Sequence, residues 1–417
     1  SSGSHLVPGS AALAWAAPSA SMAKDGMGVL VCGGAVLDCI VKPFDEAQRG
    51  ASRTSLPGSA KVSLGGVARN MAESIARLGG ISALLSAIGQ DEAGDQLLAA
   101  AGKLGINVEH VVQVPGGRTA TFTALLDGGG DLVGAVADMA VFDRVSPASI
   151  DRAVASGALR GKALVVCDAN LSAATLERVL SSGSDAGVPT WFEPVSVAKA
   201  PRGRILHGGQ PWQLISPNWD ELQAMLGSDL PKPFASEAAE GRLPDAVLRA
   251  VDEALTARLA EHMLLTMGPR GVLLASASAM PPGSTSSGSA PIGLLGSGTR
   301  RRLALDASEL LRGAPGAPPA GVVPPLEVEV ESLSVTGGRR LWYRLLRPLA
   351  SVRDTTGAGD ALLAGTARAF AHGWPLEEAV LLGLLCAHLT LFVDGAVAPF
   401  LMPDLLRRLE VQARSRL

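Results

Sequence analysis

The feature that most constrains the fold is the repeated alternation of short apolar runs with helical patterns along most of the chain. Strands that are apolar throughout are typical of parallel sheets buried on both faces, because the helix after each strand crosses one face of the sheet. The pattern predicts an α/β protein with a doubly wound, mainly parallel central sheet, helices on both faces, and ligands at the carboxyl ends of the strands. The strand candidates include "GVLVC", "ISALLSAIG", "KALVVCD", "VPTWFEP", "WQLIS", "HMLLTMG" and "GVLLAS".

A second pattern departs from this rhythm between residues 118 and 140. Two runs with period-two alternation, "RTATFTALLD" and "DLVGAVADM", lie on either side of "GGG". Such a pattern is typical of a hairpin and not of a crossover connection. With a further strand expected at about 34–43, it predicts a small β lid that projects from the main body and excludes water from a site beneath it.

The ends and one internal segment stand apart from the domain expected over 28–417. Residues 1–27 resemble an expression linker followed by a small-residue-rich stretch, and we expect no ordered structure there. The segment at about 276–330 is rich in Ser, Gly, Pro and Ala. It is predicted to be a flexible insert with one short helix around Leu303 to Leu311.

Charge and cysteine content exclude several classes of function. The 417 residues carry a formal net charge of -3, which provides no basic surface for nucleic acid or an anionic membrane, so neither is expected as a partner. The four cysteines form no Cys-x-x-Cys pair, which favours buried thiols in a reducing compartment over disulfides or zinc. The longest apolar run, at 379–393, is shorter than a membrane span and is expected to be a core helix.

The stretch "DTTGAGD" at 354–360 lies where a helix is expected to begin. A Gly-rich turn at a helix start presents backbone N–H groups and the positive end of the helix dipole to an anion, here from Gly357, Ala358 and Gly359. Asp360 could then take a proton from a substrate hydroxyl while these amides stabilise charge on a transferred phosphoryl group. Alone, the stretch is equally typical of a first-turn aspartate that balances a helix dipole.

Two signatures together resemble one enzyme family. "DTTGAGD" resembles the C-terminal signature of the PfkB, or ribokinase-like, sugar and nucleoside kinases, and "LGGVARNMAESIARLG" resembles their N-terminal Gly-Gly signature. The resemblance continues through "SPNWDEL" and "LLTMGPRGV" and covers almost everything from Gly28 to about Leu406 except the insert. It implies a ribokinase-like fold and an ATP-dependent phosphotransferase.

The resemblance also implies roles on the nucleotide side. Asp360 matches the catalytic base and Gly357 to Gly359 match the anion hole. Asn218 and Glu221 match the pair that organises Mg²⁺ around the phosphates, with Glu221 acting through water because Mg²⁺ dehydrates reluctantly. Asp354 lies where many members bind K⁺, although an ordinary turn acid is equally expected. The residues that match the lining of the ATP site are Asn218, Thr266, Gly268 and Gly271.

On the acceptor side, the resemblance is closest to the pseudouridine kinase subgroup, through motifs such as "GGAVLD", "CDANLS" and "EPVSVAKA". It implies that Asp38 accepts hydrogen bonds from two ribose hydroxyls, that Gly65 and Gly66 let the sugar approach the backbone, and that Asn70 contacts the same hydroxyls. In the lid, alternation places Thr119, Thr121 and Thr123 on one face and Ala120, Phe122 and Ala124 on the other. Thr121 or Asp138 is the candidate to contact the extra ring N–H of pseudouridine, and Asp138 could instead only close the hairpin.

Several expectations stay open at this stage. The acceptor could be another sugar or nucleoside, such as ribose or adenosine, or the chain could be an inactive scaffold, although Asp360 and its turn are intact. A homodimer through the lid is possible. The final Ser415-Arg416-Leu417 resembles a Ser-Lys-Leu address, which suggests a peroxisome or glycosome, with the cytoplasm as the alternative.

Overall fold

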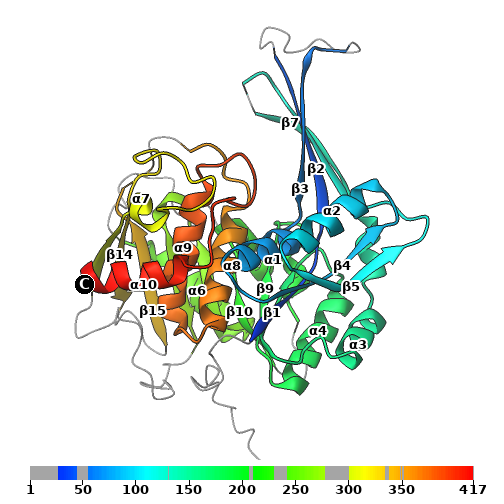
Figure 1. Ribbon diagram of the computed structural model, residues 1–417. Coiled ribbons are helices and arrows are strands. Elements are labelled where there is room, and N and C mark those ends of the chain that lie inside the picture. Colours follow the sequence, from blue (N-terminus) through cyan, green and yellow to red (C-terminus); the bar gives the residue numbers. More distant parts are fainter. Residues whose placement is uncertain are drawn as a thin grey trace, which may run out of the picture.

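A central sheet of eleven strands organises the chain in the computed structural model (Figure 1). The model describes residues 27–44, 55–129, 131–205, 210–229, 242–277, 300–333, 338–347, 349 and 352–416. The sheet order is β13-β14-β15-β12-β11-β10-β9-β8-β1-β4-β5. The strands in chain order are β1 (Gly28–Cys32), β4 (Ser82–Gly89), β5 (Asn107–Val114), β8 (Lys162–Asp168), β9 (Thr190–Glu193), β10 (Trp212–Ile215), β11 (Ala260–Thr266), β12 (Val272–Ser276), β13 (Arg300–Leu305), β14 (Leu326–Leu333) and β15 (Arg339–Leu345).

The sheet is parallel from β5 to β11 and antiparallel from β11 to β13. This confirms the predicted doubly wound architecture, with a mainly parallel sheet and helices on both faces. The turn between β11 and β12 is only a few residues long, which permits a hairpin and excludes the crossover helix of a parallel pair.

Helices cover both faces of the sheet because the strands alternate between two buried clusters. In β1, Val29 and Val31 pack into one cluster, while Leu30 and Cys32 pack into the other. The first cluster receives α1, α8, α9 and α10, and the second receives α3 to α6. The helices are α1 (Val67–Arg77), α2 (Glu92–Lys103), α3 (Pro147–Ala155), α4 (Ala173–Ala186), α5 (Trp219–Leu226), α6 (Asp245–Thr256), α7 (Ala307–Leu310), α8 (Ala358–Ala371), α9 (Leu376–Thr390) and α10 (Leu405–Arg416).

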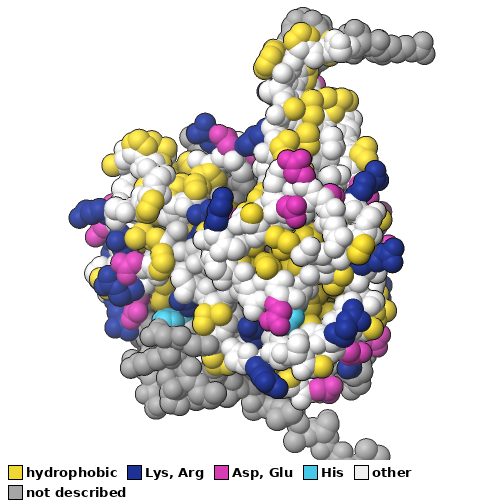
Figure 2. Space-filling view, turned by 45° about the vertical axis from the view of Figure 1, so that its right-hand side comes forward, with side chains coloured by type: hydrophobic (Ala, Val, Ile, Leu, Met, Phe, Trp, Pro, Cys, Tyr) yellow, Lys and Arg dark blue, Asp and Glu magenta, His cyan; other side chains and the backbone are white. Residues whose placement is uncertain are grey.

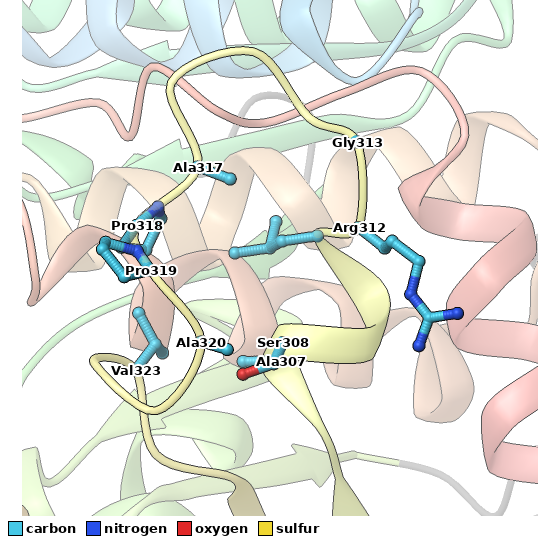
Figure 3. Close-up of a pocket in the computed structure, with 10 residues that line it drawn as sticks. Ala307, Ser308, Arg312, Gly313, Ala317, Pro318, Pro319, Ala320 and Val323 are labelled. Carbon is cyan, nitrogen blue, oxygen red and sulfur yellow. The ribbon is translucent and has the colours of Figure 1, made fainter.

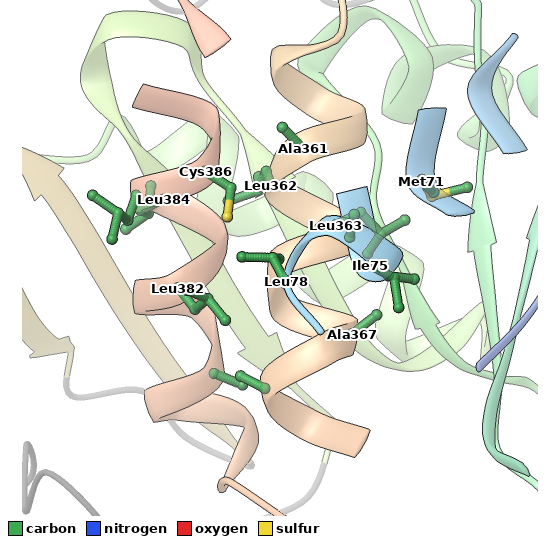
Figure 4. Close-up of a cluster of buried hydrophobic side chains, with 14 of the residues drawn as sticks. Met71, Ile75, Leu78, Ala361, Leu362, Leu363, Ala367, Leu382, Leu384 and Cys386 are labelled. Atoms are coloured by element: carbon green, nitrogen blue, oxygen red, sulfur yellow. The ribbon is translucent and has the colours of Figure 1, made fainter. Parts of the chain in front are cut away.

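Helix α8 lies between α9 and α1 in the first cluster (Figure 4). Leu363 and Ala367 of α8 face Ile75 of α1, and Cys386 projects from α9 toward α8. Helix α9 is buried on nearly all sides, which confirms the core helix predicted for the longest apolar run. Within the described ranges, no helix is both long and apolar enough to span a bilayer.

The lid is a separate four-stranded sheet with the order β3-β2-β6-β7, formed by β2 (Val36–Pro43), β3 (Gly58–Gly65), β6 (Thr121–Leu126) and β7 (Leu132–Asp138). It projects from the main body (Figure 1). The predicted hairpin is the antiparallel pair β6 and β7. Strand β3 was not predicted, because its exposed sequence "GSAKVSLG" has little apolar alternation.

The segment predicted as a flexible insert at 276–330 is instead largely folded over 300–330, which corrects that prediction. Strands β13 and β14 extend the central sheet, and Leu303, Leu305 and Val328 are buried. The sequence "LEVEVESL" alternates between apolar and polar residues, which is typical of a strand. The Pro and Gly residues around it favoured the prediction of a flexible segment instead. Residues 278–299 lie outside the described part of the chain, as do residues 1–26 of the predicted N-terminal linker.

Candidate active site

The acceptor cradle is formed by Asp38 on β2 and by Gly65 and Gly66 at the end of β3. A Cβ atom at Gly65 would lie 1.9 Å from Oδ2 of Asp38, so only glycine allows the carboxylate to lie there. Gly66 has φ 93°, and a Cβ atom there would lie 2.5 Å from the Gly34 carbonyl. Burial raises the pKa of Asp38 to about 6, and the Arg69 guanidinium offsets part of that rise.

Asn70 joins this cradle to Asp360. Its Nδ2 donates to Asp360 Oδ2 at 2.8 Å, across 290 positions of sequence. The orientation of the Asn70 amide is fixed, because its Oδ1 accepts from Arg69 Nη1 at 2.7 Å. Arg69 itself donates to the Leu64 carbonyl at 2.6 Å and pairs with Glu73. The two signature motifs therefore meet at one point, as the resemblance implies.

Asp360 lies in the first turn of α8, where it is half-buried. Burial raises the pKa of Asp360 to about 7; the hydrogen bond from Asn70 and the Arg69 charge lower it, whereas Asp168 and Asp38 raise it. A carboxyl group with a pKa near neutrality exchanges protons readily at physiological pH, which is the property that a general base needs.

The start of α8 contains the turn for which anion binding is predicted. Gly357 has φ 75°, and a Cβ atom there would lie 2.2 Å from the Ala396 carbonyl. The amide of Ala358 donates to Thr355 O at 3.3 Å, whereas those of Gly357, Gly359 and Asp360 have no acceptor among the described residues. A Cβ atom at Gly359 would meet no atom within 4 Å. Three amides at this helix start are therefore without an acceptor among the described residues, and a helix N-terminus with such donors favours an anionic group.

Asp354 has a local partner in the same turn. Its Oδ1 accepts from the amide of Thr356 at 2.8 Å, the arrangement of an Asx turn. This is the ordinary turn role that the sequence left open, and a monovalent ion at Asp354 stays a prediction.

The nucleotide-side residues gather at the ends of β10 and β11. Asn218 caps α5, where its Oδ1 accepts from the Glu221 amide at 2.9 Å and Glu221 Oε2 accepts from the Asn218 amide at 2.9 Å. Thr266 pairs with Asn218 in a short parallel bridge, and Gly268 and Gly271 form the tight turn after β11. The four residues predicted for the ATP site are thus neighbours in space.

Glu221 is buried, and burial raises its pKa. Over the described ranges, no three His, Cys, Asp or Glu side chains are grouped so that they could hold a metal ion by themselves.

Two buried acids that the sequence analysis did not select, Asp168 and Glu193, end the neighbouring strands β8 and β9. Asp168 accepts from the amides of Gly34 at 2.8 Å, Ala68 at 2.9 Å and Asn170 at 2.8 Å, so it joins three segments around the cradle. Burial raises the pKa of Glu193, and the neighbouring Glu221 and Asp360 raise it further. Their position in the sequence could have identified them, because each is the last residue of an apolar strand, and ligands bind at the carboxyl ends of parallel strands.

Thr121 and Asp138 do not lie in the cradle, which corrects their prediction as acceptor contacts. Thr121 pairs with Asp138 on one side and with Leu37 on the other, whereas Asp38 pairs with Phe122, so the two sets lie on opposite faces of the lid sheet. Asp138 instead pairs with Arg118 at 2.7 Å. The face of Asp38 and Phe122 is the one directed to the main body, because Lys61 on that face donates to the Asp394 carbonyl at 3.0 Å.

Two further features lie apart from this site. A pocket of about 210 Å³ is enclosed by α7 and the loop after it (Figure 3), and no residue of the candidate site lines it. Ser415 and Arg416 lie in the last turn of α10, where Arg416 pairs with Glu309 at 3.3 Å, and Leu417 lies outside the described residues.

Comparison with known proteins agrees with this geometry. The chain matches the pfkB family of carbohydrate kinases over residues 29–287 and 342–403. It is 27% identical over 389 residues to a pseudouridine kinase from Arabidopsis thaliana, covering 90% of this chain and 94% of the plant protein. It is 33% identical over 150 residues to a pseudouridine kinase from Escherichia coli (strain K12), covering 36% of this chain and 47% of that protein.

Solved structures agree in fold. A ribokinase from Arabidopsis thaliana, complexed with ribose and ATP, superposes with a TM-score of 0.62 at 16% identity, covering 92% of this chain and 99% of that one. A carbohydrate kinase from Agrobacterium tumefaciens gives a TM-score of 0.59 at 22% identity, covering 93% and 97%. Because the family match spans well over half of the sequence and both signatures meet at Asp360, the chain belongs to the pfkB family of carbohydrate kinases.

Proposed function

We propose that the chain transfers the γ-phosphoryl group of ATP to the 5′-hydroxyl of pseudouridine. The observation that carries this proposal is the 2.8 Å hydrogen bond from Asn70 to Asp360, which joins an acceptor cradle to a base whose pKa is about 7. A protein without catalytic activity would not need a carboxyl group with a raised pKa next to a turn whose backbone amides can donate hydrogen bonds.

The chemistry follows from the positions of these groups. Asp38, Gly65 and Asn70 hold the ribose so that its 5′-oxygen lies beside Asp360, which accepts the hydroxyl proton. The oxygen attacks the γ-phosphorus, the bond to the bridging oxygen breaks, and ADP leaves. The amides of Gly357 and Gly359 donate to the transferred group while its charge is redistributed, and such positioning and electrostatic stabilisation supply most of the catalysis in phosphoryl transfer.

Asn218 and Glu221 fit a role around the magnesium ion of the nucleotide. Only Oε2 of Glu221 accepts a hydrogen bond from the described residues, which leaves Oε1 for an ion-bound water. Burial and the negative charge of Asp220 raise the pKa of Glu221, and a nearby cation would offset both effects. When bound, Mg²⁺ neutralises phosphate charge and keeps several of its waters. Potassium at Asp354 stays a further proposal.

The choice of a nucleoside over a free sugar has structural support. Phe122 pairs with Asp38 on the inner face of the lid, and its partly buried ring offers an aromatic surface to a planar base. The relatives named as pseudouridine kinases favour this base over purines. Ribose, the ligand of the ribokinase with a similar fold, is the alternative acceptor.

A comparison of acceptors tests the proposal. ADP release should give a kcat/KM for pseudouridine at least about tenfold above that for uridine, adenosine or ribose, since a pocket built around ring hydrogen bonds discriminates against analogues that lack them. An equal or higher kcat/KM for any of the other three would leave only the family assignment.

We also propose that a second copy of the chain covers the outer face of the lid. Val62, Cys39, Thr123 and Val136 form one row across that sheet, and Val62 and Val136 are 58% and 72% exposed. Hydrophobic side chains are visible along the projecting lid (Figure 2). An exposed apolar sheet face is typical of an interface.

Light scattering should therefore give twice the mass of the chain for the wild type and the mass of one chain for Val136→Lys. Val411→Lys, at a valine 60% exposed on α10, is the matched control and should remain dimeric. A wild-type mass of one chain would contradict the proposal.

A further inference from the structure

Two segments that the catalytic groups do not use meet beside the acceptor cradle. The first, Asp168 to Asn170, begins at the last residue of β8, and the second, residues 194–199, follows β9. Lys199 Nζ donates to Asn170 Oδ1 at 2.6 Å. The backbone of Asn170 is fixed in turn, because its amide donates to the buried Asp168 at 2.8 Å. Asp168 therefore fixes the position of Asn170, and Asn170 in turn fixes the Lys199 ammonium group.

The position of Gly34 places this pair next to the sugar. A Cβ atom at Gly34 would lie 2.6 Å from Asn170 Nδ2, and a Cβ atom at Gly66 would lie 2.5 Å from the Gly34 carbonyl. Asn170 and Gly66 thus lie against the same short segment, which leads from β1 into the lid strand that carries Asp38. Strands β1, β8 and β9 run parallel, so all these groups share the ligand-binding edge of the sheet.

The loop that carries Lys199 is held in place by its own contacts. Val195 has φ 68°, which is unusual for a β-branched residue, and its amide donates to Glu193 Oε1 at 3.3 Å. Arg202 adds a second link between the segments, since its Nη1 donates to the Ala169 carbonyl at 2.8 Å. The ammonium group therefore has a defined place beside the cradle.

The Lys199 ammonium group can donate more hydrogen bonds than the described residues accept from it. Its side chain is partly buried, and burial lowers the pKa of Lys199, an effect that the Asp168 charge partly offsets. An ammonium group has three N–H donors, and Asn170 is the single hydrogen-bond acceptor given to it by the described residues. A partly desolvated donor favours an oxygen acceptor on a ligand. The cradle acid Asp38 already suits hydroxyls, whereas a pyrimidinedione ring adds carbonyl oxygens beyond the ribose.

We propose that Lys199, oriented by Asn170, donates a hydrogen bond to a ring carbonyl oxygen of the acceptor and so selects a pyrimidinedione nucleoside over an acceptor without such a carbonyl. This inference rests on the proposed function, because it assumes that the ribose lies in the Asp38 cradle. It assigns a specificity role to the two motifs, "CDANLS" and "EPVSVAKA", that the catalytic groups leave without one.

The test compares acceptors that differ in the carbonyl groups. The substrates are pseudouridine, free ribose and a phenyl C-riboside, which keeps the C-glycosidic bond and a flat ring but has no carbonyl. Lys199→Met should lower kcat/KM for pseudouridine about tenfold or more, because the contact removed is a hydrogen bond from a charged group. The values for ribose and the phenyl riboside should stay within about twofold, and Lys199→Arg should restore part of the preference for pseudouridine.

Lys162→Met is the matched control, since Lys162 is also a partly buried lysine, at the opposite end of β8, and burial lowers its pKa as well. It should change none of the three values. Equal losses for all acceptors in Lys199→Met would assign Lys199 a purely structural role and overturn the inference, as would no loss. If the wild type has a higher kcat/KM for ribose or adenosine than for pseudouridine, the proposed function is overturned instead. The ratio of kcat/KM for pseudouridine to that for the phenyl riboside would still test the role of Lys199. A wild type that phosphorylates neither riboside overturns both.

Discussion

Replacement of Asp360 by asparagine is expected to lower kcat by about 10²–10⁴-fold with little effect on folding, because it keeps the shape of the side chain and removes the proton acceptor. The amide can still contact Asn70, which lies 2.8 Å from the carboxylate. Steady-state rates with pseudouridine and with ribose, together with the thermal midpoint, would measure both parts of this expectation.

The matched control is Asp95→Asn, because Asp95 lies in the first turn of α2 as Asp360 lies in the first turn of α8, but Asp95 is exposed to solvent. If Asp360 only balances a helix dipole, the two substitutions should have equally small effects. Because the pKa of Asp360 is raised to about 7, the carboxylate is lost as the pH falls below that value. Wild-type kcat/KM should therefore decrease toward acid from about pH 7, and near-normal turnover of Asp360→Asn would refute the assignment of the base.

Most of the parallel half of the sheet could be predicted, because strands such as β1, β4 and β8 are buried apolar runs and helices separate them. The antiparallel edge was harder to predict. Strand β13 buries only Leu303 and Leu305, β14 carries glutamates at alternate positions, and both are flanked by stretches rich in Pro and Gly. Period-two alternation as short as "RRRLAL" in β13 is a weak signal beside such composition, and this strand is recognised only once it pairs with β14.

The lid shows a second limit of sequence patterns. The alternation of side chains along the lid strand correctly placed its threonines and Phe122 on opposite faces of the lid sheet. The same pattern cannot predict which of the two faces is directed to the main body. That choice depends on how the sheet is attached, and the contact from Lys61 to the Asp394 carbonyl puts Phe122 and Asp38 on the inner side. The alternative that the sequence left open for Asp138, a role in the hairpin alone, agrees with its ion pair with Arg118.

The candidate site was predictable where one motif holds its residues, as in the turn from Gly357 to Asp360. Asp168 lies in the quoted motif "CDANLS", but the motif does not reveal its role, because that role depends on three amides that are far apart in sequence. A single acid after an apolar strand is common at the edge of any parallel sheet, so only the fold distinguishes it. The same holds for Lys199, which follows β9, because its partner Asn170 follows a different strand, β8.

Substitution of Gly359 by alanine is expected to abolish most activity while leaving the fold intact. A Cβ atom at this position meets no protein atom within 4 Å, and alanine in place of glycine in a helix stabilises it by up to about 1 kcal/mol. The same open space is where the transferred phosphoryl group would accept hydrogen bonds from the amides. The added methyl group should therefore lower kcat/KM by about 10²-fold or more, a loss similar to that of one oxyanion donor.

Gly357→Ala, two residues earlier in the same turn, should behave in the opposite way. Its φ is 75°, and its Cβ atom would lie 2.2 Å from the Ala396 carbonyl, which belongs to the backbone and cannot rotate away. The left-handed conformation alone costs about 1–2 kcal/mol for a residue with a Cβ atom, so the thermal midpoint should decrease. Since the Gly359 variant should lose activity at an unchanged or raised midpoint, measuring both quantities for both variants separates an obstructed anion site from a damaged fold. Full activity of Gly359→Ala would mean that the phosphoryl group does not lie over this turn.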